Sequence, residues 1–163
     1  NKFISNLTLS LEGNTLVLFS FVEKHGKVLY DLVNSKVAKG RQVFFVFGGT
    51  DADTRESIRA ITEKESNAII IASYGTFSTG INIRNLHNIV FASPSKSRIR
   101  NLQSIGRGLR KSDNKTSCIL YDIADDMQYK KSVNHTLRHL YERVKIYNEE
   151  QFDYKMYKIK LEK

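Results

Sequence analysis

Hydrophobic residues gather in five short continuous runs, separated by segments whose apolar positions recur at helical spacing. The runs are rich in β-branched and aromatic residues, and they span residues 15–21, 43–47, 68–73, 88–92 and 117–123. Such continuous hydrophobicity is typical of parallel strands covered on both faces. Helical spacing predicts helices over 22–38, with Gly40 as the stop, over 53–64 and from Val133 onward. The alternation predicts an α/β fold with a doubly wound, mostly parallel sheet and helices on both faces.

Three smaller features refine this outline. Residues 3–11 are weakly patterned and are expected to be a lead-in, because the chain opens at Asn1 without an initiator Met and so suggests a fragment of a longer polypeptide. Asp53 is the expected N-cap of its helix, with Glu56 completing a capping box. The tail from Gln151 mixes aromatics with lysines, which fits either a nucleic-acid contact or a closing helix or strand packed on the domain.

The composition shows that the chain is basic. The 163 residues, 40% of them hydrophobic, are enough for one domain with a real core. Basic residues outnumber acidic ones by 26 to 17, and this balance favours a polyanionic partner such as nucleic acid. Six basic residues and no acid lie between Lys96 and Lys111, so the charge is concentrated.

Other classes of protein and site are disfavoured. No apolar run approaches the length of a membrane span and the N-terminus lacks a secretory pattern, so we expect no membrane contact and a cytoplasmic location, in the host cell if this is a phage protein. The single Cys118 lies in an apolar run and is expected to be a small buried hydrophobe. His135 and His139 have metal-ligand spacing but no third ligand nearby, so we predict no metal site.

The segment Gln103–Lys111, QSIGRGLRK, carries the most specific chemistry. Apolar residues at helical spacing before and through it predict a helix with one buried face, on which Arg107 and Arg110 lie one turn apart. Glycines cost helix stability, and a sequence that keeps them usually lets a backbone or ligand come close. Two guanidinium groups on one face suit a polyphosphate, although a solvated basic helix face is an equally good interpretation of the chemistry alone.

A second polar segment, Tyr74–Ile83, follows the third predicted strand. In an α/β sheet, ligands bind beyond the carboxyl ends of the strands. Its glycines let a backbone approach a phosphate, and its Thr, Ser and Asn side chains supply hydrogen-bonding groups. A plain connecting loop remains the alternative on composition alone.

These segments together resemble the second RecA-like domain of superfamily 2 helicases. The motif VI pattern Q-x-x-G-R-x-x-R is matched position for position by Gln103, Gly106, Arg107 and Arg110. The motif V core is matched by Thr79, Gly80, Ile81 and Asn82, with Asn82 standing where many relatives have Asp. Weaker matches are 19–21 to motif IV and 48–50 to a glycine segment that touches the nucleic-acid backbone, so the resemblance covers residues 15 to about 125.

The resemblance implies a RecA-like domain over residues 1–130 and a C-terminal helical extension over 131–163 packed on it. It implies ATP with Mg²⁺ as cofactors, the Mg²⁺ being held by an N-terminal RecA-like domain of the same polypeptide. The implied catalytic residues are Arg107 and Arg110. The implied ATP-binding residues are Gly80, Asn82, Gln103, Arg107 and Arg110. The implied nucleic-acid contacts are Gly49, Thr50, Tyr74, Thr76 and Thr79.

The implied activity is that of an ATP-dependent DNA helicase. The run from Ala72 to Lys111 is similar to phage members of the superfamily that act on branched or forked DNA in replication, recombination and repair, including junction branch migration and R-loop unwinding. The chain has neither a G-x-x-x-x-G-K-[ST] phosphate loop nor an Asp-Glu box after a strand, so we expect it to be inactive on its own. A non-catalytic nucleic-acid-binding module and an RNA-directed helicase are the alternatives.

Overall fold

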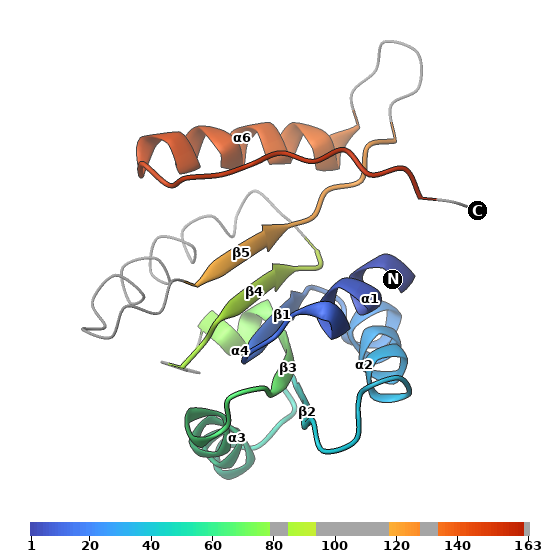
Figure 1. Cartoon of the computed structure of the whole chain (residues 1–163), viewed down its shortest axis with the longest axis vertical. Helices are drawn as coiled ribbons and strands as arrows, with labels where there is room; N and C mark the ends of the chain where they lie inside the picture. Colours follow the sequence, from blue (N-terminus) through green and yellow to red (C-terminus); the bar gives the residue numbers. More distant parts are fainter. Residues whose placement is uncertain (79–84, 94–117, 128–133, 162–163) are drawn as a thin grey trace.

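The structure, a computed structural model, describes residues 1–78, 85–93, 118–127 and 134–161. Within these ranges the strands form one five-stranded sheet in the order β2-β3-β1-β4-β5, and every neighbouring pair is parallel (Figure 1). The strands are β1 (Thr15–Phe19), β2 (Val43–Val46), β3 (Ile69–Ser73), β4 (Asn88–Phe91) and β5 (Ile119–Asp122). The predicted doubly wound parallel sheet is confirmed, and the five hydrophobic runs are its strands.

The helices follow the predicted pattern with two additions. They are α1 (Lys2–Ser10), α2 (Lys27–Asn34) with a π-helical turn η1 (Val22–Gly26) before it, α3 (Ala52–Lys64), α4 (Tyr74–Ser78) and α6 (His135–Glu149). The prediction of a lead-in over residues 3–11 is wrong, because this segment is the helix α1. Ile4 of α1 is buried in the same apolar cluster as Leu29 and Val33 of α2. Packing against α2 therefore stabilises a helix that the weak apolar pattern did not predict.

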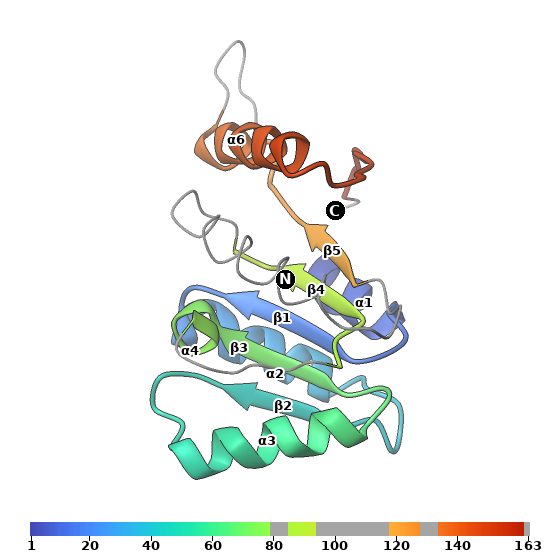
Figure 2. The same ribbon diagram turned by 90° about the vertical axis from the view of Figure 1, so that its left-hand side faces the viewer.

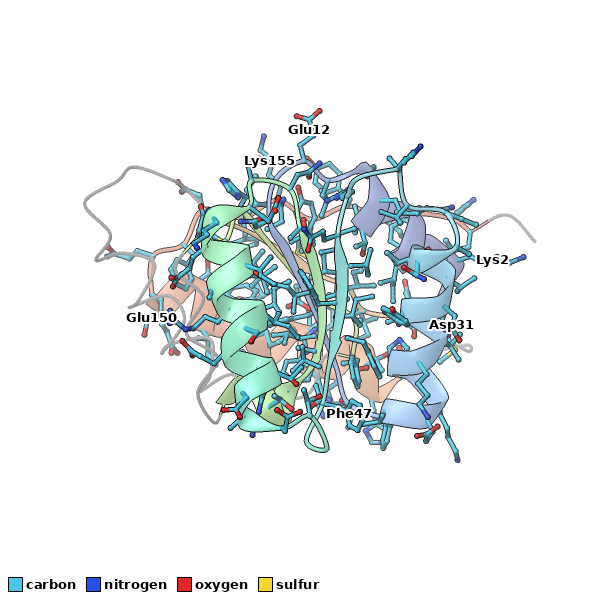
Figure 3. All side chains as sticks on the ribbon, turned by 90° about the horizontal axis from the view of Figure 1, so that it is seen from below. Lys2, Glu12, Asp31, Phe47, Glu150 and Lys155 are labelled. Carbon is cyan, nitrogen blue, oxygen red and sulfur yellow. The ribbon has the colours of Figure 1, made fainter. Side chains whose placement is uncertain are left out.

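The three central strands, β1, β3 and β4, are buried on both faces, which explains their unbroken hydrophobic runs. Leu16 and Leu18 of β1 belong to one apolar cluster, together with residues of α3 and α6. Val17 and Phe19 belong to the other, together with residues of α1 and α2. Figure 2 shows the strands stacked from β2 to β5 with α6 beyond β5, and Figure 3 shows α3 on the opposite side of the sheet from α1 and α2.

The π-helical turn η1 brings the start of α2 against the central strand β1. The backbone N–H groups of His25 and Gly26 both donate to the Phe21 carbonyl, at 3.1 and 2.9 Å. A Cβ atom on Gly26 would lie 2.4 Å from the buried ring of Phe19, so only glycine permits this approach. The helix predicted over 22–38 therefore begins with a widened turn and ends at Asn34. Gly40, the predicted stop, lies beyond that end in a left-handed conformation.

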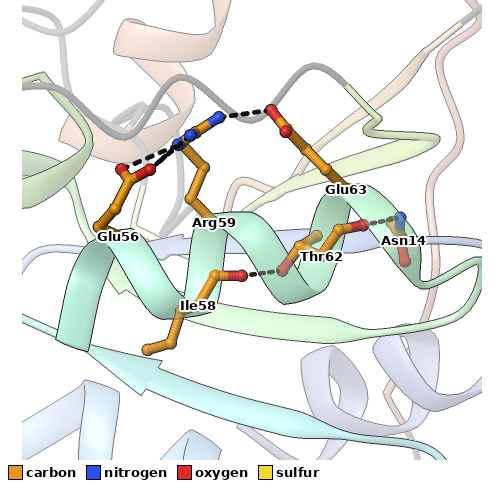
Figure 4. Close-up of polar contacts among 6 residues, drawn as sticks. All are labelled: Asn14, Glu56, Ile58, Arg59, Thr62 and Glu63. Carbon is orange, nitrogen blue, oxygen red and sulfur yellow. Dashed lines mark hydrogen bonds and ion pairs between the residues drawn. The ribbon is translucent and has the colours of Figure 1, made fainter. Parts of the chain in front are cut away.

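Side-chain amides tie the amino ends of the strands together. The side-chain nitrogen of buried Asn14 lies 3.0, 2.7 and 2.8 Å from the carbonyl oxygens of Thr62, Glu65 and Asn85, and its oxygen accepts from the Ala68 N–H at 2.8 Å. Figure 4 shows the first of these contacts at the end of α3. One asparagine before β1 thus joins α3, the start of β3 and the segment before β4.

A buried ion pair attaches α6 to the last strand. Arg143, 1% exposed, donates from Nε and Nη2 to the two carboxylate oxygens of Asp122, at 2.6 and 2.8 Å. The Tyr147 hydroxyl donates to the same carboxylate at 2.6 Å. The Tyr147 ring is part of the apolar cluster that contains Leu16, so α6 shares the core of the sheet. The division of the chain at residue 130 remains a prediction.

Replacing Gly26 by Ala should destabilise the chain. The added methyl group meets the Phe19 ring inside a packed core, and such overpacking costs about 1–3 kcal/mol in free energy of unfolding. Gly48→Ala is the control, since a Cβ there has nothing within 4 Å. Urea denaturation of both variants tests this, and equal free energies of unfolding would mean that the close approach does not require glycine.

Candidate nucleotide and nucleic-acid site

The parallel order brings the predicted motifs to one edge of the sheet. β1, β2, β3 and β4 all point the same way, so the segments after Phe19, Val46, Ser73 and Phe91 leave the sheet at its carboxyl edge. Ligands in open α/β sheets bind at this edge. The site described below is therefore assembled from segments whose preceding strands end at residues 19, 46, 73 and 91, far apart in sequence but at one edge of the sheet.

Many of the predicted site residues lie outside the described residues. These are Thr79, Gly80, Asn82, Gln103, Arg107 and Arg110, together with the predicted helix around Gln103–Lys111. Their roles stay predictions. The described part of the site comprises the turn after β2, the start of α4 after β3, and the segments after β1 and β4.

The glycine segment after β2 is a tight turn held by Thr50. The Thr50 N–H donates to the Phe47 carbonyl at 2.9 Å, and the Thr50 hydroxyl accepts from the Phe47 N–H at 3.1 Å. Gly48 and Gly49 are exposed at the tip of this turn. A Cβ on Gly49 would lie 2.7 Å from the Phe47 ring, so glycine keeps the turn compact. The turn can offer backbone N–H groups and the Thr50 hydroxyl proton to a phosphate.

Asp51 begins α3 directly after this turn. Its carboxylate accepts hydrogen bonds from the Thr54 N–H and the Thr54 hydroxyl, at 2.8 and 2.7 Å. The prediction of Asp53 as the N-cap is wrong, because the helix begins two residues earlier than expected from the apolar pattern. Glu56 is likewise not part of a capping box; it pairs with Arg59 on the exposed helix surface (Figure 4).

The start of α4 places the two predicted residues after β3 in the interior. Thr76 is 2% exposed and its hydroxyl shares a hydrogen bond of 2.7 Å with the Ser73 hydroxyl. Tyr74 is 4% exposed, with its ring centroid 5.6 Å from that of Phe91. Gly75 between them is exposed. Nucleic-acid contact by Tyr74 and Thr76 stays a prediction; in this structure their side chains hold the segment in place, and the backbone of Gly75 faces outward.

The structure adds a contact that sequence patterns did not indicate. His25 Nδ1 and the Ser93 hydroxyl share a hydrogen bond of 2.6 Å, which joins η1 to the end of β4. Burial is the main cause that lowers the pKa of His25. Phe21, where the chain leaves β1, is exposed at this same edge. No sequence signal predicts the His25–Ser93 pairing, because the two residues are brought together only by the parallel alignment of β1 and β4.

Other candidate chemistry does not form a site. The rings of His135 and His139 lie 6.4 Å apart on α6, and no group of three His, Cys, Asp or Glu side chains in the described ranges could hold a metal ion. Burial raises the pKa of the Cys118 thiol to about 11, so it stays protonated and packs against the core. No helix in the part of the chain that the structure covers is long and apolar enough to cross a membrane.

Comparison with known proteins identifies the family. The family described as helicase conserved C-terminal domain matches residues 1–112. The chain belongs to this family. The resemblance to the second RecA-like domain of superfamily 2 helicases is thereby confirmed, and so is the RecA-like fold class.

One similar protein, matched both by its sequence and by its solved structure, supports the assignment of this helicase domain. The ATP-dependent DNA helicase uvsW of Enterobacteria phage T4 is 37% identical over 174 residues, which cover 99% of this chain and 34% of uvsW. The crystal structure of T4 UvsW matches with a TM-score of 0.76 and 36% identity, over 93% of this chain and 32% of that one. The chain thus spans about a third of the length of this relative.

A more distant solved structure shares the fold alone. Domain 2 of the DEAD-box helicase Mss116p, solved bound to an RNA duplex, matches with a TM-score of 0.56 and 15% identity. The match covers 69% of this helicase domain and 43% of the Mss116p chain.

The Asp51 cap beside the glycine turn should make stability depend on pH. Hydrogen bonds from the Thr54 hydroxyl, and then from its N–H, hold the pKa of the Asp51 carboxyl below its ordinary value. The cap therefore stabilises the fold fully above the unfolded pKa of about 3.9, and this stabilisation is lost as the pH falls through the folded pKa.

We expect Asp51→Asn, which keeps a capping side chain but cannot titrate, to show a shallower fall in melting temperature between about pH 5 and pH 2. Asp51→Ala should be less stable than both at neutral pH, because it has no cap. A decline in Asp51→Asn as steep as in the wild type would show that the cap does not contribute to acid sensitivity.

Proposed function

We propose that this chain is the C-terminal half of the motor of an ATP-dependent DNA helicase that remodels branched DNA. Its substrates would be replication, recombination and repair intermediates, including junctions undergoing branch migration and R-loops, in the cytoplasm of the cell or, for a phage protein, of its host. The observation that carries the proposal is the 37% identity to uvsW over nearly the whole chain, in a domain that matches motif VI at Gln103, Gly106, Arg107 and Arg110.

In this proposal ATP binds in a cleft between the carboxyl edge of this sheet and an N-terminal RecA-like domain of the same polypeptide. The N-terminal domain supplies the phosphate loop and the carboxylates that hold Mg²⁺, which neutralises charge on the transferred phosphate. This domain supplies Arg107 and Arg110 to the γ-phosphate, with Arg110 as the arginine finger. Gly80, Asn82 and Gln103 complete its share of the ATP site. The chain alone has no phosphate loop and is therefore proposed to be inactive.

The same edge of the sheet is proposed to hold one strand of the DNA. The exposed Gly48–Thr50 turn offers backbone N–H groups, which contact phosphates without reading the base sequence. The Tyr74–Thr79 segment begins at the neighbouring strand β3, and its buried Tyr74 and Thr76 side chains support the exposed Gly75. Backbone recognition suits an enzyme that must act on many sequences.

The link between ATP and DNA is proposed to run through the segments that leave β1 and β4. The His25–Ser93 hydrogen bond joins these two segments at the carboxyl edge. Ser93 is followed by the chain that leads to motif VI, so a shift of the arginines on closing of the ATP cleft is passed to η1 and to exposed Phe21. Repeated closing and opening of the ATP cleft would move the strand-binding sites of the two domains along a strand.

Replacing Arg110 by Lys in the complete parent polypeptide should abolish ATP hydrolysis and leave DNA binding intact. Lysine keeps the charge but lacks the planar fork that stabilises the transferred phosphate, so the rate should fall by about 10³-fold or more. Arg138→Lys, on the exposed surface of α6, is the matched control and should leave both activities unchanged. ATPase assays beside DNA titrations test this; wild-type turnover in the Arg110 variant would favour a non-catalytic binding module.

A further inference from the structure

The last described segment, residues 152–161, is extended and largely exposed. It forms neither helix nor strand, although a closing helix or strand was one interpretation of its sequence. Tyr157 is 78% exposed and Met156 60%, which is unusual for side chains of this size. Beyond Tyr154 the segment thus leaves large side chains such as Met156 and Tyr157 exposed.

The path of this segment is nevertheless defined by contacts. Gln151 has a left-handed φ of 57°, which reverses the chain at the end of α6, and Figure 1 shows the tail running back beside that helix. The rings of Phe152 and Tyr154 lie 6.4 and 6.3 Å from that of Tyr147. Farther along, Lys158 Nζ lies 3.0 Å from a carboxylate oxygen of Asp126. These contacts anchor the segment at both ends.

The segment is strongly basic and carries interspersed aromatic rings. Residues 154–161 include Lys155, Lys158 and Lys160 and no acidic residue, and all three lysines are exposed. The ion pair from Lys158 to Asp126 is at the surface and therefore weak, so a phosphate can replace Asp126. Exposed tyrosines among lysines are the combination that binds single strands, since bases stack on the rings and phosphates meet the charges.

A protein strand as partner fits the pattern less well. In an extended chain alternate residues share a face, so Tyr157, Ile159 and Leu161 lie on one side. Lys155 lies on that same side, and Met156 lies on the other, so neither face is uniformly apolar. A neighbouring sheet would have to bury a lysine or leave a large apolar side chain exposed.

The location separates this segment from the edge that carries the motifs. Figure 3 shows Lys155 at the same end of the domain as Glu12, which precedes β1, and at the opposite end from Phe47, which follows β2. Nucleic acid bound here is therefore held far from the Gly48–Thr50 turn, either as a second strand or as a distant part of the same strand.

We propose that Tyr154–Leu161 binds single-stranded nucleic acid as a second contact, away from the carboxyl edge of the sheet. Tyr157 stacks on a base, and Lys155, Lys158 and Lys160 contact phosphates. This inference rests on the proposed function, because it assumes that the parent polypeptide acts on nucleic acid. It gives the parent polypeptide a contact with nucleic acid that persists whether the ATP cleft is open or closed.

Titration of the complete parent polypeptide with a labelled oligo-dT strand over a range of salt concentrations tests the proposal. A plot of the logarithm of the binding constant against the logarithm of salt concentration has a negative slope. Replacing the three lysines by Ala should make this slope shallower by about 2, since each phosphate contact on a single strand contributes roughly 0.7. The matched control replaces Lys2, Lys36 and Lys39, three exposed lysines elsewhere on the domain, and should keep the wild-type slope. Equal slopes for the two triple variants would overturn the proposal.

Tyr157→Ala should weaken binding of the same strand about 10-fold, and Tyr157→Phe should restore it, because stacking needs only the ring. Ile159→Ser is the comparison that detects a protein partner. If it reduces strand binding or changes the oligomeric state while Tyr157→Ala does neither, the segment docks on protein and the proposal is wrong.

Failure of this proposal is distinguishable from failure of the proposed function. A wild-type polypeptide that hydrolyses ATP in response to DNA, with a tail variant of unchanged salt slope, overturns only the tail contact. A wild type that binds no DNA overturns both.

Discussion

The domain depends on one geometric constraint, the parallel alignment of all five described strands around β1. Parallel strands require crossover helices, and these cover both faces of the sheet, so β1 contributes Leu16 and Leu18 to one core and Val17 and Phe19 to the other. The same alignment sends every carboxyl end to one edge. The burial of the central strands and the shared edge at which the chain leaves β1, β2, β3 and β4 are therefore two consequences of a single arrangement.

The two edges of the sheet are built differently. At the amino edge, Asn14 joins three segments and the Arg41 guanidinium donates to the carbonyls of Leu11 and Asn67, at 2.8 and 3.0 Å. At the carboxyl edge the described contacts are the turn after β2, closed by Thr50, and the polar pair His25–Ser93. Among the described residues, the amino edge is thus tied together by buried side-chain hydrogen bonds, whereas the carboxyl edge has exposed glycines at Gly48, Gly49 and Gly75.

The attachment of α6 extends the core beyond the last strand. Burial, and then the Asp122 carboxylate, raise the pKa of the Tyr147 hydroxyl, so it remains a donor to that carboxylate together with Arg143. A buried pair of this kind is costly to break, because either partner alone would be an uncompensated charge. It also fixes the helix end from which the tail departs.

Sequence patterns predicted the strands well because burial on both faces leaves unbroken apolar runs. They failed for α1, whose helicity depends on packing of Ile4 against α2, and for the start of α3, where Asp51 lies outside the apolar pattern. The resemblance to the helicase family implied roles for residues after β2 and β3, but the burial of Tyr74 and Thr76 depends on tertiary contacts that a motif does not contain. The His25–Ser93 contact is likewise a product of strand order.

In the proposed function, the nucleotide and the nucleic-acid strand both bind this domain at the carboxyl edge of its sheet. Hydrogen exchange on the complete parent polypeptide, with and without a non-hydrolysed ATP analogue and DNA, tests it most directly. We expect slower exchange at 20–26, 47–51 and 74–78 when both ligands are bound, and no change in the amino-edge turns at 35–42 and 65–68. Protection confined to those amino-edge turns, or absent from the carboxyl edge, would contradict it.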